Sequence, residues 1–133
     1  MRAIPVFLFA FAALLSGCNN DCPGGTECAL GPSCYDSCER LFGEGDGLCN
    51  IQIPGKDGAS GRSEMIRDCV AHCEGALNRA GEVGDYTPDE RASGDDDVSL
   101  ENDAQAALWM DCVAETSCEN LDKNYCAPVK NFP

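Results

Sequence analysis

The sequence predicts a mostly α, small disulfide-stapled helical domain with about three helices and long irregular loops. Three observations predict this fold class. The chain of 133 residues contains eleven cysteines, three segments carry apolar residues at helical spacing, and the segments between them are rich in glycine or in acidic residues. A chain with this many cysteines typically relies on disulfides as well as on its apolar core.

The first predicted helix begins after Ser33 and ends at Gly43. Ser33 can cap the helix, Asp36 follows three residues later, and glycine is a common helix stop. The apolar positions between them recur at helical spacing: Cys34, Cys38, Leu41 and Phe42. Residues 43–62 are rich in glycine and predict an irregular excursion, with a brief extended piece at 51–53.

The second predicted helix begins with Ser63 as its cap and ends at Gly81. It has one continuous apolar stripe, formed by Met65, Ile66, Cys69, Val70, Cys73, Ala76, Leu77 and Ala80. This is the strongest helical pattern in the chain.

A third helix is predicted over residues 99–117, after a polar and acidic segment, residues 81–97, that predicts a flexible loop. Trp109 adjoins the apolar side of this helix, which favours a place in the core. The tail, residues 118–133, predicts a short turn of helix followed by an extended end.

Two cysteine pairs with the same spacing lie on the first two helices. Residues four apart share a helix face, so each pair projects both thiols from one side. Antiparallel helices would join Cys34 to Cys73 and Cys38 to Cys69, whereas parallel helices would exchange the partners; we favour the antiparallel arrangement. Residues 33–81 thereby resemble the doubly stapled helical hairpins of several small cysteine-rich families, an architectural likeness that implies no activity.

Six further cysteines allow 15 pairings, and the sequence does not choose among them: Cys22, Cys28, Cys49, Cys112, Cys118 and Cys126. We expect Cys112, Cys118 and Cys126 to attach the third helix and the tail to the hairpin.

The first 17 residues predict a secretory signal peptide. Arg2 precedes an apolar run from Ile4 to Leu15, and small residues follow. A run of this length is too short to cross a bilayer, which requires about 20 helical residues.

The end of the apolar run, Leu15-Ser16-Gly17-Cys18, resembles the lipobox of bacterial lipoproteins at all four positions. The resemblance implies that Cys18 receives a diacylglyceryl group and palmitate, and that cleavage follows Gly17. It divides the chain into a signal peptide (1–17), a lipidated N-terminus with a cysteine-containing loop (18–32) and a disulfide-rich domain (33–133). Asn19 implies the outer membrane of a Gram-negative envelope. Assigning Cys18 to lipid also leaves an even number of cysteines for disulfides.

The acidic composition restricts the partners. A formal net charge of −14 disfavours binding to nucleic acid. The expected partners are the lipid bilayer, through acylated Cys18, and an envelope or extracellular protein of unknown identity.

Sequence motifs for catalysis are absent. The chain has no G-x-S-x-G, H-E-x-x-H or phosphate-binding glycine motif, and it has a single histidine. We therefore expect that the protein is not an enzyme and binds no cofactor. Two alternatives remain, a secreted disulfide-rich inhibitor or toxin-like module and a small acidic-site or metal-dependent hydrolase.

Two candidate metal sites are weak. Cys69, His72 and Cys73 have spacing that zinc permits, but an oxidising compartment favours disulfides, and we expect His72 to point toward solvent. The acidic loop between Asp85 and Asp97 does not follow the EF-hand order, which leaves only weak calcium binding open. We therefore expect no metal site.

Overall fold

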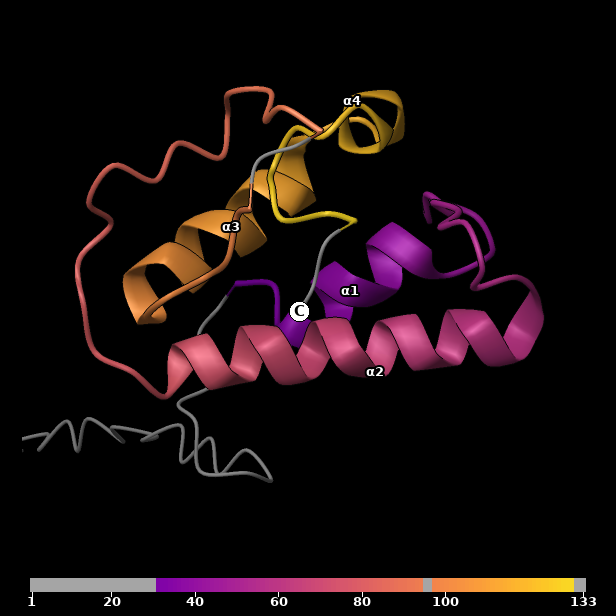
Figure 1. Ribbon diagram of the computed structural model, residues 1–133, viewed down its shortest axis with the longest axis horizontal. Helices are drawn as coiled ribbons and strands as arrows, with labels where there is room; N and C mark the ends of the chain where they lie inside the picture. Colours follow the sequence, from indigo (N-terminus) through magenta and orange to yellow (C-terminus); the bar gives the residue numbers. More distant parts are fainter. Residues whose placement is uncertain (1–30, 95–96, 131–133) are drawn as a thin grey trace, which may run out of the picture.

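The computed structural model describes residues 31–94 and 97–130. These ranges contain four helices and no strand: α1 (Cys34–Phe42), α2 (Gly58–Leu77), α3 (Asp103–Glu115) and α4 (Cys118–Asp122). The long helix α2 forms one edge of the domain, and α1 and α3 lie on the same side of it (Figure 1). These three helices contact one another, so the domain is a small helical assembly of the predicted class.

Helix α1 has the bounds that its local signals predict. The Ser33 side chain accepts a hydrogen bond from the Asp36 N–H, and the Asp36 carboxylate accepts one from the Ser33 N–H, which completes a capping box. At the other end, a Cβ on Gly43 would lie 2.4 Å from the Glu39 carbonyl oxygen, so the chain can leave the helix here only through glycine.

Helix α2 begins earlier and ends earlier than predicted. It begins at Gly58, and Ser63 lies inside the helix, where its hydroxyl donates to the Ala59 carbonyl instead of capping. A Cβ on Gly61 would lie 2.3 Å from the Lys56 carbonyl oxygen, so this glycine lets the incoming loop pack against the first turn. The helix ends at Leu77.

Helix α3 is shorter than predicted at both ends. Asn102 caps it by accepting a hydrogen bond from the Gln105 N–H, so residues 99–102 precede the helix. The helix ends at Glu115, and the short α4 follows as the helical turn expected in the tail.

The segment 81–97 is held at several points in its described part, contrary to the prediction of a flexible loop. The Tyr86 hydroxyl donates to the Ala127 carbonyl over 2.6 Å, and the buried Pro88 accepts from the Cys126 N–H over 2.7 Å. Burial raises the pKa of Tyr86 and keeps its hydroxyl protonated as a donor. These anchors are single residues without a helical or strand period, which is why the sequence pattern did not indicate them.

The core lies between α1, α2 and α3 and extends to the C-terminal tail. Trp109 is 0 % exposed, so its predicted burial is confirmed. The 51–53 segment forms no strand, but Ile51 is buried and donates its N–H to the Leu41 carbonyl. The large buried side chains are Leu41, Phe42, Ile51, Met65, Leu100, Trp109, Met110, Val113, Leu121 and Val129.

Arg40 joins α1 to the C-terminal end of α3. Its guanidinium donates to the carbonyl oxygens of Gly47, Val113 and Thr116, each over 2.9 Å. The last carbonyls of a helix lack intrahelical donors and carry partial negative charge, so a cation is well placed there.

We expect Arg40→Met to lower the free energy of unfolding by about 2–3 kcal/mol, because charge-assisted hydrogen bonds are lost and carbonyl groups are left without a donor. Chemical denaturation measures the change. Arg91→Met is the matched control, since Arg91 is exposed and donates its Nε–H to one carbonyl, that of Lys123. Equal losses for the two variants would contradict this role of Arg40.

Candidate functional site

The described cysteines form four disulfides. Two of them join α1 to α2, Cys34–Cys73 and Cys38–Cys69, and this is the pairing of the antiparallel alternative. Both bonds lie in the core, where three of the four cysteines are 0 % exposed.

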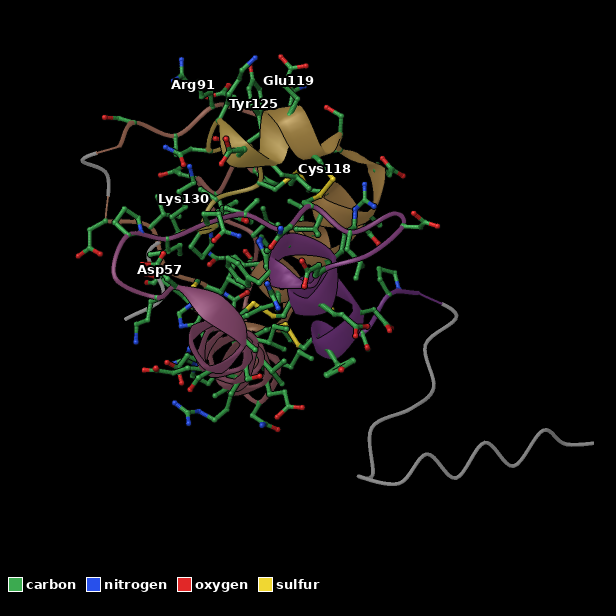
Figure 2. The ribbon with its side chains drawn as sticks, turned by 90° about the vertical axis from the view of Figure 1, so that its right-hand side faces the viewer. Asp57, Arg91, Cys118, Glu119, Tyr125 and Lys130 are labelled. Carbon is green, nitrogen blue, oxygen red and sulfur yellow. A yellow bond between two sulfur atoms is a disulfide. The ribbon has the colours of Figure 1, made fainter. Side chains whose placement is uncertain are left out.

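The other two disulfides attach the C-terminal part of the chain. Cys49–Cys118 joins the α1–α2 connection to α4, and Cys112–Cys126 joins α3 to the tail. Figure 2 shows the sulfur–sulfur bond of Cys118 on the same side of the domain as Glu119 and Tyr125. We expected Cys112, Cys118 and Cys126 all to attach to the hairpin. Only Cys118 does so, through Cys49, because Cys112 and Cys126 are bonded to each other. Cys18, the predicted lipidation site, and Cys22 and Cys28 lie outside the described residues.

His72 is half-buried and does not simply point toward solvent, contrary to the prediction. Its Nε2 accepts a hydrogen bond from the Leu100 N–H over 3.0 Å. The guanidinium of Arg79, two residues after the end of α2, donates to the Leu100 carbonyl over 3.1 Å. His72 and Arg79 therefore hold both backbone polar groups of Leu100, in the segment before α3. Burial lowers the pKa of His72, and the positive charge of Arg79 lowers it further.

We expect His72 to make stability depend on pH. Its folded-state pKa lies below the ordinary value of about 6.5, so the unfolded chain takes up the proton first as the pH falls. The stabilisation is complete above the ordinary pKa and is lost as the pH falls through the folded pKa. Urea denaturation between roughly pH 7.5 and pH 5 measures this loss, and His72→Gln, which retains an acceptor but does not titrate, should have a flatter profile. Identical profiles would exclude His72 as the cause.

The candidate metal ligands do not assemble. The sulfur atoms of Cys69 and Cys73 are bonded to Cys38 and Cys34, so neither is a thiolate beside His72. Across residues 31–94 and 97–130, no group of three His, Cys, Asp or Glu side chains is arranged to hold a metal ion. Asp85, Asp89, Glu90 and Asp97 are exposed, and Asp95 and Asp96 lie outside the described residues.

A shallow groove lies on the outer face of α1 and α2. It has a volume of about 500 Å³, whereas two other hollows hold about 20 and 10 Å³, room for no more than one or two water molecules. The groove is lined by Tyr35 of α1 and by the apolar side chains of Ile66, Val70 and Ala71 of α2. Arg67 and Glu74 place opposite charges along it.

This groove suits a macromolecular surface better than a small substrate, because it is open and holds no converging set of catalytic side chains. Tyr35 is 53 % exposed, and its hydroxyl donates to the Glu39 carboxylate over 3.2 Å. Nearby negative charge and this hydrogen bond raise the pKa of Tyr35. Aromatic side chains with a large exposed area and a polar tip are common anchors in protein interfaces.

The sequence pattern contained part of this site. Ile66 and Val70 belong to the predicted apolar stripe, and both pack against the core while they are only partly buried. Met65, Cys69, Cys73 and Ala76 are buried, whereas Ile66 and Val70 remain half-exposed at the groove. Tyr35 was not predicted, because a single aromatic residue beside a cysteine has no periodic signal.

Comparison with known proteins identifies no relative of this chain. The chain matches no protein-family model, and no curated protein and no solved structure is significantly similar to it. Separately, none of the helices between residues 31 and 130 that the structure describes combines the length and apolar character that a bilayer-spanning segment requires.

Proposed function

We propose that this chain is a lipid-anchored protein of the bacterial cell envelope, placed at the outer membrane, with a structural or binding role. The main support for this is the pairing of the cysteines in disulfides. All eight cysteines of the described residues are paired in disulfides, which favours an exported protein. An odd total of eleven leaves a cysteine over, and Cys18 lies at the end of the lipobox-like segment.

The anchor follows from the chemistry expected at Cys18. One acyl chain holds a protein to a bilayer only marginally, whereas two or more hold it stably. The domain itself needs no apolar membrane segment in this scheme. Its groove on α1 and α2 supports a binding role rather than catalysis.

Substitution of Cys18 tests this proposal. Cells that produce the full chain are labelled with radioactive palmitate, and their envelopes are separated from the soluble fractions. We expect label in the parent protein and in Ser16→Ala, which keeps a small residue before the cleavage site. The Cys18→Ala protein should carry no label and should no longer be found in the envelope fraction.

Two results would contradict the anchor: a parent protein without label, or equal labelling of Cys18→Ala. Release of an unlabelled, cleaved parent into the medium would favour the secreted inhibitor or toxin-like alternative. The mass of the mature N-terminus separates these cases, because acylation adds a lipid-sized increment to Cys18.

A further inference from the structure

The groove on α1 and α2 has a symmetry that a second copy of the chain can use. Arg67 and Glu74 are seven residues apart, so they lie on the same face of α2, two turns and about 10 Å apart along its axis. In an antiparallel pair of α2 helices whose two-fold axis passes between residues 70 and 71, position 67 of each copy lies opposite position 74 of the other. Each contact then occurs twice, as a two-fold interface requires.

Next to the proposed two-fold axis this face is apolar and carries the small residue Ala71. Val70 of one copy would lie opposite Ala71 of the other, and Ile66 lines the groove one turn before Val70. The Ala71 side chain is small enough to let two helices approach closely, while Val70 and Ile66 supply apolar area. Tyr35 stands beside this face and would cover the helix of the second copy.

The charges select this arrangement. Each chain has a formal net charge of −14, so two copies repel one another at a distance. The antiparallel alignment places Arg67 of each copy opposite Glu74 of the other, with one such pair on either side of the two-fold axis. A parallel alignment would place Arg67 against Arg67 and Glu74 against Glu74.

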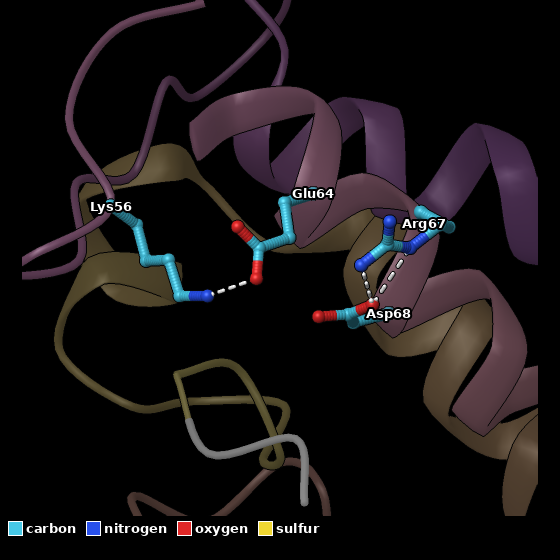
Figure 3. Close-up of polar contacts among 4 residues, drawn as sticks. All are labelled: Lys56, Glu64, Arg67 and Asp68. Carbon is cyan, nitrogen blue, oxygen red and sulfur yellow. Dashed lines mark hydrogen bonds and ion pairs between the residues drawn. The ribbon is translucent and has the colours of Figure 1, made fainter. Parts of the chain in front are cut away.

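Both side chains can take a new partner. Asp68 accepts hydrogen bonds from Nε and Nη2 of Arg67 (Figure 3), and the guanidinium retains Nη1 as a further donor. The Arg67 side chain is 71 % exposed, so its pair with Asp68 is a weak surface contact. The Glu74 carboxylate makes no ion pair with another described residue. Glu64, on the same helix, is already paired with Lys56.

We propose that the groove binds a second copy of the chain, with the two α2 helices antiparallel and Arg67 of each paired with Glu74 of the other. This deepens the binding role proposed above by naming the partner. An interface of about four helical turns is smaller than the roughly 800 Å² per partner of a standard complex, so the self-association is weak in dilute solution. Confinement by the proposed lipid anchor raises the effective concentration and favours the dimer.

Photo-cross-linking in intact cells tests the proposal on the full chain. A photoreactive phenylalanine derivative replaces Ala71, which lies beside the two-fold axis. Irradiation should give a product of twice the chain mass, with the cross-link on α2 of the second copy near residue 70. The same derivative at Leu108, an exposed position of α3, should give no such product.

Charge reversal distinguishes this geometry from other contacts. Arg67→Glu and Glu74→Arg, each made in the Ala71 photoreactive chain, should reduce the cross-linked product roughly tenfold, because two attractive pairs become repulsive. Producing the two single variants together should restore the product, since one copy then carries two anions and the other two cations. Equal denaturation midpoints would show that these exposed substitutions leave the fold intact.

Four results would overturn the proposal: no dimer at position 71, dimers that ignore the charge reversals, no recovery when the two variants are produced together, or cross-links only to lipid, to another protein or to residues 19–30 of the same chain. Palmitate labelling in the same cells separates the two proposals. Labelled protein without a dimer would overturn only the second-copy proposal, and a dimer without label would overturn only the lipid anchor.

Discussion

Replacing Cys38 and Cys69 together with alanine should lower the free energy of unfolding by about 4 kcal/mol. The bond between them spans a sequence separation of 31 residues, and the chain-entropy estimate for a loop of this length is about 3.7 kcal/mol. Both cysteines are 0 % exposed, so shortening their side chains also removes packing in the core. A domain of this size is typically stable by only about 5–15 kcal/mol, so the variant should be close to unfolding.

Guanidinium denaturation measures this loss, with helical circular dichroism as the signal. Ser37→Ala is the matched control, because Ser37 is buried beside Cys38 on α1 and its hydroxyl has no partner among the described residues. Removing a buried unpartnered hydroxyl should change stability by less than about 1 kcal/mol. If the double cysteine variant were as stable as Ser37→Ala, the disulfide would not be a major support of the hairpin.

Replacing Trp109 with alanine is expected to cost about 3–5 kcal/mol of folding free energy. The Trp109 side chain is 0 % exposed, and its Nε1–H donates to the Cys126 carbonyl over 3.0 Å. The substitution therefore leaves a cavity in the core beside α3 and leaves the buried Cys126 carbonyl without its donor. Trp109→Phe should be less damaging, since it keeps most of the volume and loses the hydrogen bond.

Leu108→Ala provides the control for this position. Leu108 precedes Trp109 on the same helix but is 36 % exposed, so its loss should cost less than about 1 kcal/mol. Because Trp109 is the only tryptophan, circular dichroism replaces fluorescence as the signal. Similar losses in the two variants would show that Trp109 is not the centre of the core.

The elements that the sequence predicted well are those defined by neighbouring residues. Ser33, Asp36 and Gly43 fix α1 through a capping box and a close backbone approach, which are local interactions. The start of α2 was predicted wrongly because Gly58 and Gly61 are typical of loops. In the folded chain, Gly61 instead makes room for the Lys56 backbone, a contact that no local pattern reveals.

The features that the sequence could not predict depend on distant parts of the chain. His72 is half-buried because the Leu100 segment packs on α2. The pairings of Cys49 and Cys112 depend on how α3 and α4 dock against the hairpin, whereas the two α1–α2 disulfides follow from helical spacing and direction. The groove combines one predicted stripe on α2 with Tyr35 of α1, and only the docking of these helices brings them together.

The most direct test of the lipid anchor and of the disulfide pairing is non-reducing mass spectrometry of the protein extracted from cell envelopes. The expected result is a chain that begins at an acylated Cys18, with no free thiol and with linked peptides for Cys34–Cys73, Cys38–Cys69, Cys49–Cys118 and Cys112–Cys126. An uncleaved chain in the cytosol, with unmodified Cys18 and reduced thiols at these positions, would contradict it.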